Sequence, residues 1–151
     1  MNLKSLFLAL NIIVVILVLS SCEKENETKI SSYGNSESHN MGQDCMNCHK
    51  NGGDGEGWFN IAGTVYEKQF NSSYPNATVH LYTGPGGTGT LNYTIQVDAK
   101  GNFYTTESID FGAGLYPAVE GETSTEYMIT PVTNGKCNSC HGITEDKIWT
   151  L

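Results

Sequence analysis

The sequence of 151 residues contains no arginine, and its eight basic residues are all lysine. Against 16 Asp and Glu residues, this leaves a formal net charge of −8 at pH 7. Nucleic-acid binding depends on clustered positive charge and often uses the planar guanidinium group. The composition therefore argues against DNA or RNA as a partner, and it favours a well-solvated acidic surface.

Long apolar runs are also scarce, and the one that exists lies at the N-terminus. Residues Leu6 to Leu19 are apolar apart from Asn11. This run is short for a membrane span and is typical of a signal-peptide core. We therefore interpret residues 1–21 as a signal peptide. The alternative is an uncleaved anchor helix.

The residues Leu19-Ser20-Ser21-Cys22 that follow resemble a bacterial lipobox. The resemblance implies cleavage before Cys22 and attachment of lipid to its sulfur. It implies a protein outside the cytoplasm, anchored by lipid to the outer membrane and facing the periplasm or the cell surface. The acidic stretch Glu23 to Glu27 resembles the surface-export signal of lipoproteins in Bacteroidetes-type bacteria, and an ordinary charged linker is the alternative.

Apolar residues are nearly missing from the next segment. Between residues 22 and 38 only Ile30 and Tyr33 could bury apolar area after the lipobox cysteine. Such a composition cannot offset the entropy lost on ordering. The sequence therefore predicts a flexible, disordered tether over 22–38.

The other four cysteines form two copies of one pattern, C-x-x-C-H. The copies are Cys45-Met46-Asn47-Cys48-His49 and Cys137-Asn138-Ser139-Cys140-His141. This spacing is the attachment signature of c-type haem. Two thiols bond to the two vinyl groups of one porphyrin, and the adjoining imidazole reaches the iron.

The two patterns resemble those of a dihaem c-type cytochrome. The resemblance implies two covalent c-type haems, the first on Cys45 and Cys48 and the second on Cys137 and Cys140. His49 and His141 are then the proximal iron ligands. We expect the haem-binding segments to be 39–57 and 133–151.

The chain contains few histidines. The chain has four, and His39 and His80 remain once the motifs are counted. Two six-coordinate irons need two further axial ligands. We therefore predict His39 and His80 as the distal ligands, with Met41, Met46 and Met128 as rival ligands.

Two other uses of the paired cysteines stay open at this point. Widely separated C-x-x-C pairs can bind zinc through four thiolates, or each pair can close a disulfide. Neither use explains why a histidine follows both pairs, and the gap between Cys48 and Cys137 is far longer than in a zinc ribbon.

The middle of the chain, from 58 to 132, has a period of two, which is typical of β-strands. Strands are expected in six stretches separated by turn residues. They are 61–66, 77–82, 93–98, 103–106, 115–119 and 126–131. Turns at this spacing favour a small antiparallel β-sandwich, so we predict a mainly β protein whose sandwich is flanked by the two haem-binding segments.

Three stretches carry a second resemblance. Ile61 to Val65, Ala77 to Tyr82 and Val97 to Phe103 resemble the carboxypeptidase regulatory-like, or transthyretin-like, β-sandwich. That family usually has seven strands. An odd number would place the chain ends, and hence the two haems, at opposite poles, and would suit a head-to-tail oligomer.

No Ser/His/Asp set is evident, so no enzymatic activity is expected. The sequence favours electron transfer by a membrane-anchored dihaem cytochrome that exchanges electrons with redox partner proteins. The alternative is a surface adhesion or interaction lipoprotein with zinc or disulfides at the C-x-x-C pairs. Haem sensing or storage is a third reading.

Overall fold

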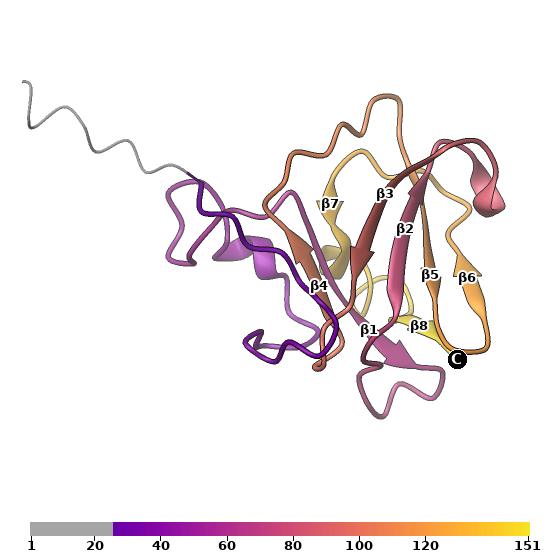
Figure 1. Ribbon diagram of the computed structural model, residues 1–151, viewed down its shortest axis with the longest axis horizontal. Coiled ribbons are helices and arrows are strands. Elements are labelled where there is room, and N and C mark those ends of the chain that lie inside the picture. The colour runs from indigo at the N-terminus through magenta and orange to yellow at the C-terminus, as the bar shows by residue number, and fades with distance from the viewer. Residues whose placement is uncertain (1–25) are drawn as a thin grey trace, which may run out of the picture.

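Alternating apolar residues build two β-sheets that enclose one hydrophobic core (Figure 1). The computed structural model describes residues 26–151, and the protein is mainly β. The first sheet has the order β4-β1-β7, with β8 also paired to β1, and the second has the order β3-β2-β5-β6. The strands are β1 (Ile61–Glu67), β2 (Thr78–Tyr82), β3 (Leu91–Gln96), β4 (Asn102–Thr105), β5 (Tyr116–Glu120), β6 (Thr125–Tyr127), β7 (Gly135–Lys136) and β8 (Ile148–Thr150).

Three short 3-10 helices interrupt the strands. They are η1 (Cys45–Asn47), η2 (Pro85–Gly87) and η3 (Cys137–Ser139). Two of them begin at the first cysteine of a C-x-x-C-H copy. No helix within residues 26–151 has the length and apolar character needed to cross a bilayer.

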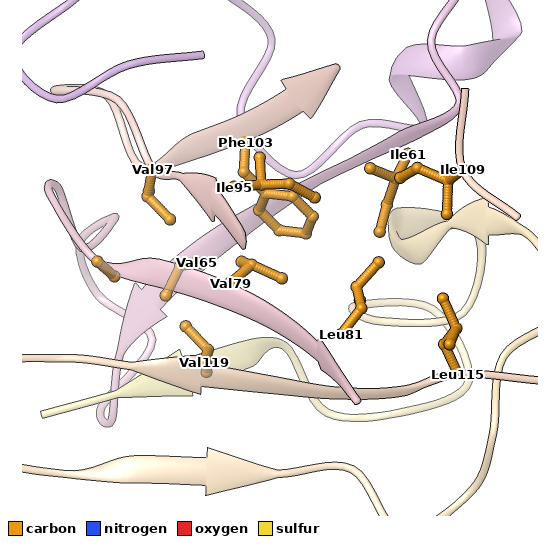
Figure 2. Close-up of a cluster of buried hydrophobic side chains, with 11 residues drawn as sticks. Ile61, Val65, Val79, Leu81, Ile95, Val97, Phe103, Ile109, Leu115 and Val119 are labelled. Carbon is orange, nitrogen blue, oxygen red and sulfur yellow. The ribbon is translucent and has the colours of Figure 1, made fainter. Parts of the chain in front are cut away.

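The hydrophobic core lies between the two sheets (Figure 2). Ile61 and Val65 of β1 and Phe103 of β4 enter it from the first sheet, and each is at most 1% exposed. The second sheet contributes the buried residues Val79, Leu81, Ile95 and Val119. The period of two therefore predicted the core-facing side of these strands correctly, because side chains alternate between the faces of a sheet.

Strand β1 is buried on both faces. All five residues from Ile61 to Val65 are buried. One edge of β1 pairs antiparallel with β4. The other edge pairs parallel with β7 at Ile61 and Ala62, and then parallel with β8 from Val65 to Glu67. Residues 137–147, which include the second C-x-x-C-H copy, thus form a loop between β7 and β8, and both of these strands pair with the same edge of β1.

Two predictions about the sandwich need correction. The predicted sandwich ended at 132, but 133–151 contributes β7 and β8 to the first sheet. That sheet is therefore mixed, and only the second sheet is wholly antiparallel as predicted. Strands of two and three residues are too short to show a period of two, so the sequence pattern could not reveal them.

The flexible tether predicted over 22–38 is wrong for 26–38. Ser31 is 2% exposed, its amide donates to the Tyr104 carbonyl (2.9 Å), and its hydroxyl donates to the Gln96 carbonyl (2.6 Å). Asn26 bonds to Trp58 in both directions. Hydrogen bonds to β-strand edges and loops, rather than apolar burial, hold this segment. Cys22 and the apolar run before it lie outside the described residues.

Candidate haem-binding site

The two C-x-x-C-H copies adopt the same backbone turn. In the first, the amides of Cys48 and His49 both donate to the Cys45 carbonyl, at 3.2 and 2.9 Å. In the second, Cys140 and His141 donate to the Cys137 carbonyl at 3.2 and 3.0 Å. The shared pattern places the two thiols and the imidazole of each copy on one tight turn, as attachment to a single porphyrin requires.

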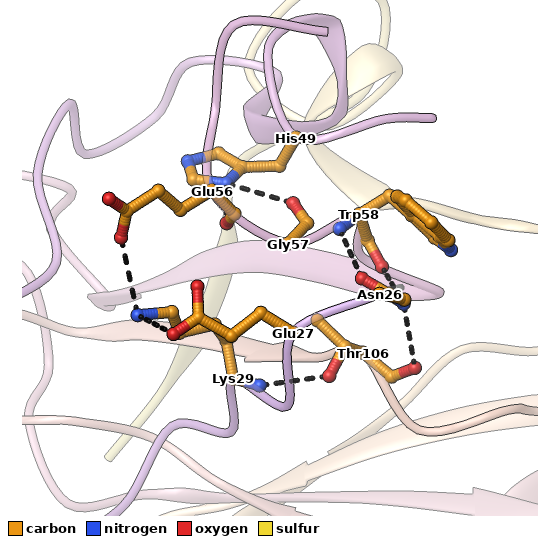
Figure 3. Close-up of polar contacts among 8 residues, drawn as sticks. All are labelled: Asn26, Glu27, Lys29, His49, Glu56, Gly57, Trp58 and Thr106. Atoms are coloured by element: carbon orange, nitrogen blue, oxygen red, sulfur yellow. Dashed lines mark hydrogen bonds and ion pairs between the residues drawn. The ribbon is translucent and has the colours of Figure 1, made fainter. Parts of the chain in front are cut away.

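Both motif histidines have one ring nitrogen anchored to the backbone. His49 Nδ1 donates to the carbonyl of Glu56 at 2.9 Å, with Gly57 O at 3.3 Å (Figure 3). His141 Nδ1 donates to the carbonyl of Asp146 at 2.6 Å. A metal-bound histidine usually donates its other N–H in this way, which orients the ring and leaves Nε2 for the metal.

The His49 ring is further fixed by packing. Phe59 stacks on it with 4.2 Å between ring centroids and an angle of 9° between planes. A side chain at Gly55 would lie 2.7 Å from His49 Nδ1, so only glycine leaves room for the ring. Stacking covers a ring face, whereas Nε2 points along the ring plane, so the packing orients His49 without blocking that nitrogen.

The first motif borders an open cleft of about 230 Å³. Its lining includes His39, Cys45, Cys48 and His49, together with Phe59 and Tyr104 below them. Enclosed ligand pockets are larger, about 300–1,000 Å³, so a haem here would have an exposed edge. The sequence predicted Cys45, Cys48 and His49 for the first haem and His39 as a distal ligand of one of the two haems. The structure brings these four residues together.

The distance between His39 and His49 fits a pair of axial ligands. Their ring centroids are 5.9 Å apart. Two imidazoles that each place a nitrogen about 2 Å from a metal between them would have centroids about 6 Å apart. The donor chemistry and the spacing therefore both suit a bis-histidine haem at the first motif.

The second motif is built into the sheet. The Cβ of Cys137 would lie 3.0 Å from a Cβ added at Gly63 of β1, and the Cys137 side chain packs against the core. The pKa of the Cys137 thiol is raised to about 12, mainly by burial and in smaller part by the nearby Cys45. Cys140 is exposed, so one thiol of this pair faces the core and the other faces solvent.

The two motifs lie side by side on β1, so the predicted placement at opposite poles is wrong. Asn138 Nδ2, inside the second motif, donates to the Gln43 carbonyl at 2.9 Å, two residues before the first motif. Asp44 and Cys45 are close enough to act electrostatically on Cys137. The two motifs meet because the last two strands return to the edge of β1. The predicted head-to-tail oligomer depended on opposite poles and loses that support.

His80 lies away from both motifs. It belongs to β2 in the second sheet, on the face opposite Val79 and Leu81, as its alternation predicted. Its Nε2 is 2.7 Å from Glu120 Oε2, and its Nδ1 is 3.4 Å from Thr94 Oγ1. The structure therefore gives His80 a cross-strand polar partner, and it does not support His80 as a ligand to a haem of its own chain.

The structure contains neither a disulfide nor a four-thiolate site among the four motif cysteines. The four motif cysteines are free thiols. Across residues 26–151, no three His, Cys, Asp or Glu side chains converge as a metal-binding group. A site with four thiolates would need the two motif turns to rearrange.

One lysine forms ion pairs with two glutamates at the border of the first cleft. Lys29 Nζ lies 3.3 Å from Glu27 Oε1 and 3.3 Å from Glu56 Oε2 (Figure 3). Hydrogen bonds to Glu27 and then to Glu56 raise the pKa of the Lys29 ammonium. The loop that anchors His49 is thus tied to the N-terminal segment by Glu56.

Sequence reasoning missed a set of buried polar residues between the motifs. Thr64, Asn102 and Asn138 are 1%, 2% and 3% exposed. Asn138 occupies a variable position of C-x-x-C-H, so the motif gives no signal for it. Asn102 falls in the turn expected between the strands 93–98 and 103–106, and nothing in that turn indicated that Asn102 reaches the residues before the first motif.

Comparison with family models, with curated proteins and with solved structures finds no match to this chain. Its function is therefore argued from its own residues.

Proposed function

We propose that this protein transfers electrons through two covalently bound c-type haems. The observation that carries the proposal is the repeated motif geometry. Each C-x-x-C-H turn holds its histidine by an Nδ1 hydrogen bond to a backbone carbonyl, at 2.9 Å for His49 and 2.6 Å for His141. A haem, when bound, supplies an iron that takes up and releases one electron.

The residues would divide between two sites. Cys45 and Cys48 would hold the first haem, with His49 and His39 as its axial ligands. Cys137 and Cys140 would hold the second, with His141 as its proximal ligand. The proximity of the two turns on β1 supports electron exchange between the two haems inside one chain.

Acidic groups surround the first site. Glu37, Asp44 and Glu56 line its cleft, and Lys29, the one basic residue in the lining, pairs with Glu56. Negative charge stabilises the ferric state over the ferrous state and lowers the reduction potential, as does bis-histidine rather than His/Met ligation. We therefore propose a low potential for the first haem and a role as donor to redox partner proteins of higher potential.

The proposed lipid anchor would hold the first haem near the membrane. If Cys22 carries the lipid, the chain from Cys22 to Asn26 can span at most about 14 Å. Asn26 in turn hydrogen-bonds to Trp58, next to the loop that anchors His49. A Cys22→Ser variant should leave the membrane fraction while keeping its haem. Retention in that fraction would contradict the anchor.

One experiment tests the proposed function directly. The full-length gene is co-expressed with the c-type haem maturation machinery, and the purified protein is denatured in acid before its visible spectrum and intact mass are recorded. We expect a haem spectrum that stays with the polypeptide, and two haems per chain. Replacing Cys45 and Cys48 by Ala should remove one haem, and replacing Cys137 and Cys140 should remove the other. A colourless chain that binds zinc through its thiols would overturn the proposal in favour of the interaction-module alternative.

A further inference from the structure

A gap in strand pairing exists where the second motif leaves β1. Strand β7 pairs with Ile61 and Ala62, and β8 resumes at Val65, so Thr64 has no strand partner on this edge. The amide of Thr64 donates instead to Asn138 Oδ1 at 3.1 Å. Asn138 thus takes the place of a strand residue, which satisfies a buried backbone N–H.

The two hydrogens of the Asn138 side-chain amide connect the second motif to the segment before the first motif and to Thr64. Its Nδ2 donates to the Gln43 carbonyl at 2.9 Å and to Thr64 Oγ1 at 3.1 Å. Thr64 Oγ1 in turn accepts from the Gly42 amide at 2.9 Å and donates to Asn102 Oδ1 at 2.7 Å. Both hydrogens and the oxygen of this side-chain amide therefore bond to β1 or to the segment before the other motif.

The segment that carries His39 depends on these bonds. No residue from 38 to 43 is buried. Its anchors are the Gly42 and Gln43 bonds just described and three further bonds. Asn102 Nδ2 donates to Ser38 Oγ (2.9 Å) and to the His39 carbonyl (3.4 Å), and Lys100 Nζ donates to the Ser38 carbonyl (2.8 Å). Because the segment has little apolar burial, these polar anchors decide where the His39 ring lies.

We propose that Asn138, a residue of the second motif, is a positioning residue for His39 at the first haem site, and that it acts through Thr64 and Gly42. The role of His39 as an iron ligand rests on the proposed function. The hydrogen bonds that connect Asn138 to the 38–43 segment do not depend on the proposed function, because they are formed by the polypeptide alone.

The link is tested first without reference to haem. Asn138→Ala removes three hydrogen bonds. Thr64→Val removes the hydroxyl but keeps a β-branched side chain that suits the strand. Ser139→Ala is the matched control in the same motif, because Ser139 is exposed and its hydroxyl bonds only within the turn, to the Lys136 carbonyl at 2.6 Å, apart from a 3.9 Å contact with Cys140 Sγ. The measurement is amide hydrogen exchange of the full-length protein by NMR.

We expect the Gly42 amide to exchange about tenfold faster or more in Asn138→Ala and Thr64→Val, the change expected for the loss of one hydrogen bond. Exchange of the β2 amides, which are remote from the network, should stay as in the unaltered protein. Unchanged Gly42 exchange in Thr64→Val would overturn the link, and so would equal acceleration in Ser139→Ala.

The second readout is the spectrum of the haem-loaded protein. His39→Ala gives the reference spectrum of a first haem without its distal ligand. Asn138→Ala and Thr64→Val should shift the low-spin signal toward that reference while two covalent haems remain. Combining Thr64→Val with His39→Ala should add no further shift, since both changes act on one ligand.

The failures are distinguishable. A chain without covalent haem contradicts the proposed function and leaves the exchange test to decide the link. A chain with two haems, a His39-dependent spectrum and no response to Asn138→Ala or Thr64→Val contradicts the positioning role alone.

Discussion

The two C-x-x-C-H motifs share one turn but differ in what supports it. The first rests in an open cleft lined mainly by loops, with His39 across from His49 at 5.9 Å between ring centroids. The second is inserted between β7 and β8, with Cys137 packed against the core and Cys140 exposed. The motif therefore specifies local geometry only, and the surrounding fold decides burial, ligand supply and coupling to stability.

The largest effect is expected at Gly63 of β1. A Cβ there would lie 2.5 Å from Phe103 Cζ and 3.0 Å from the Cβ of Cys137. Gly63→Ala should therefore lower the free energy of unfolding by about 3 kcal/mol through overpacking, measured by urea denaturation.

Gly55→Ala is the matched change at the first motif. It crowds the His49 ring in a loop, at 2.7 Å from Nδ1. We expect it to disturb the first haem's spectrum at a cost below about 1 kcal/mol. Equal losses of stability in the two variants would contradict the contrast between a sheet-embedded and a loop-borne motif.

Next in size is a pH dependence that belongs to the second motif. Burial raises the pKa of the Cys137 thiol from 9.0 to about 12. The folded state then holds this proton more tightly than the unfolded state, so its contribution to stability is full below pH 9 and is lost as pH rises towards 12. In protein without haem, we expect a loss on the order of 2 kcal/mol between pH 9 and 11.

Cys137→Ser and the haem-loaded protein are the controls for that measurement. A thioether carries no titrating proton, so haem attachment at Cys137 should remove this part of the alkaline loss. An identical pH profile with and without haem would contradict either the burial of Cys137 or its attachment.

Thiol reactivity should rank the cysteines of the haem-free protein. The thiolate is the nucleophile, and a raised pKa lowers its fraction, partly offset by greater intrinsic reactivity. For Cys137 the net effect at pH 8 is a rate roughly thirtyfold slower than that of an ordinary thiol. Iodoacetamide labelling followed by peptide mass spectrometry should modify the exposed Cys48 and Cys140 first. Early labelling of Cys137 would place it outside the core.

The smallest change in stability, with a clear spectral effect, is expected from His39→Ala. His39 is exposed, so its loss should cost less than about 0.5 kcal/mol, yet the first haem should lose part of its low-spin signal. His80→Ala is the opposite case. It breaks the 2.7 Å pair with Glu120 at a cost of about 1 kcal/mol and should leave the spectrum unaltered. A spectral change in His80→Ala would restore His80 as a ligand.

Local patterns in the sequence predicted much of this molecule. The alternation of Val79 and Leu81 with His80 identified the core face of β2, and five strands formed close to where the period of two placed them. The sixth, expected at 126–131, is the shorter β6 at Thr125–Tyr127. The C-x-x-C-H copies located both candidate sites, and counting histidines led to His39. Each of these inferences depends on neighbours in sequence or on chemistry carried by the residues themselves.

What the sequence could not give is pairing at long range. Ser31 is buried through bonds to Tyr104 and Gln96, so a polar segment became ordered without apolar residues. Strands β7 and β8 exist because β1 has a free edge, and they bring Cys137 beside Cys45. Asn138 is important because it accepts a hydrogen bond from the Thr64 amide, which no strand residue pairs with on that edge. None of these partners leaves a local signature.

The central claim is that two covalent haems lie side by side on β1. It is tested most directly by electron paramagnetic resonance of the fully oxidised, haem-loaded protein, compared with the two variants that each lack one cysteine pair. The account predicts spin coupling between the irons, so that the summed spectra of the single-haem variants fail to reproduce that of the intact protein. A spectrum equal to that sum, from protein shown to carry two haems, would contradict it.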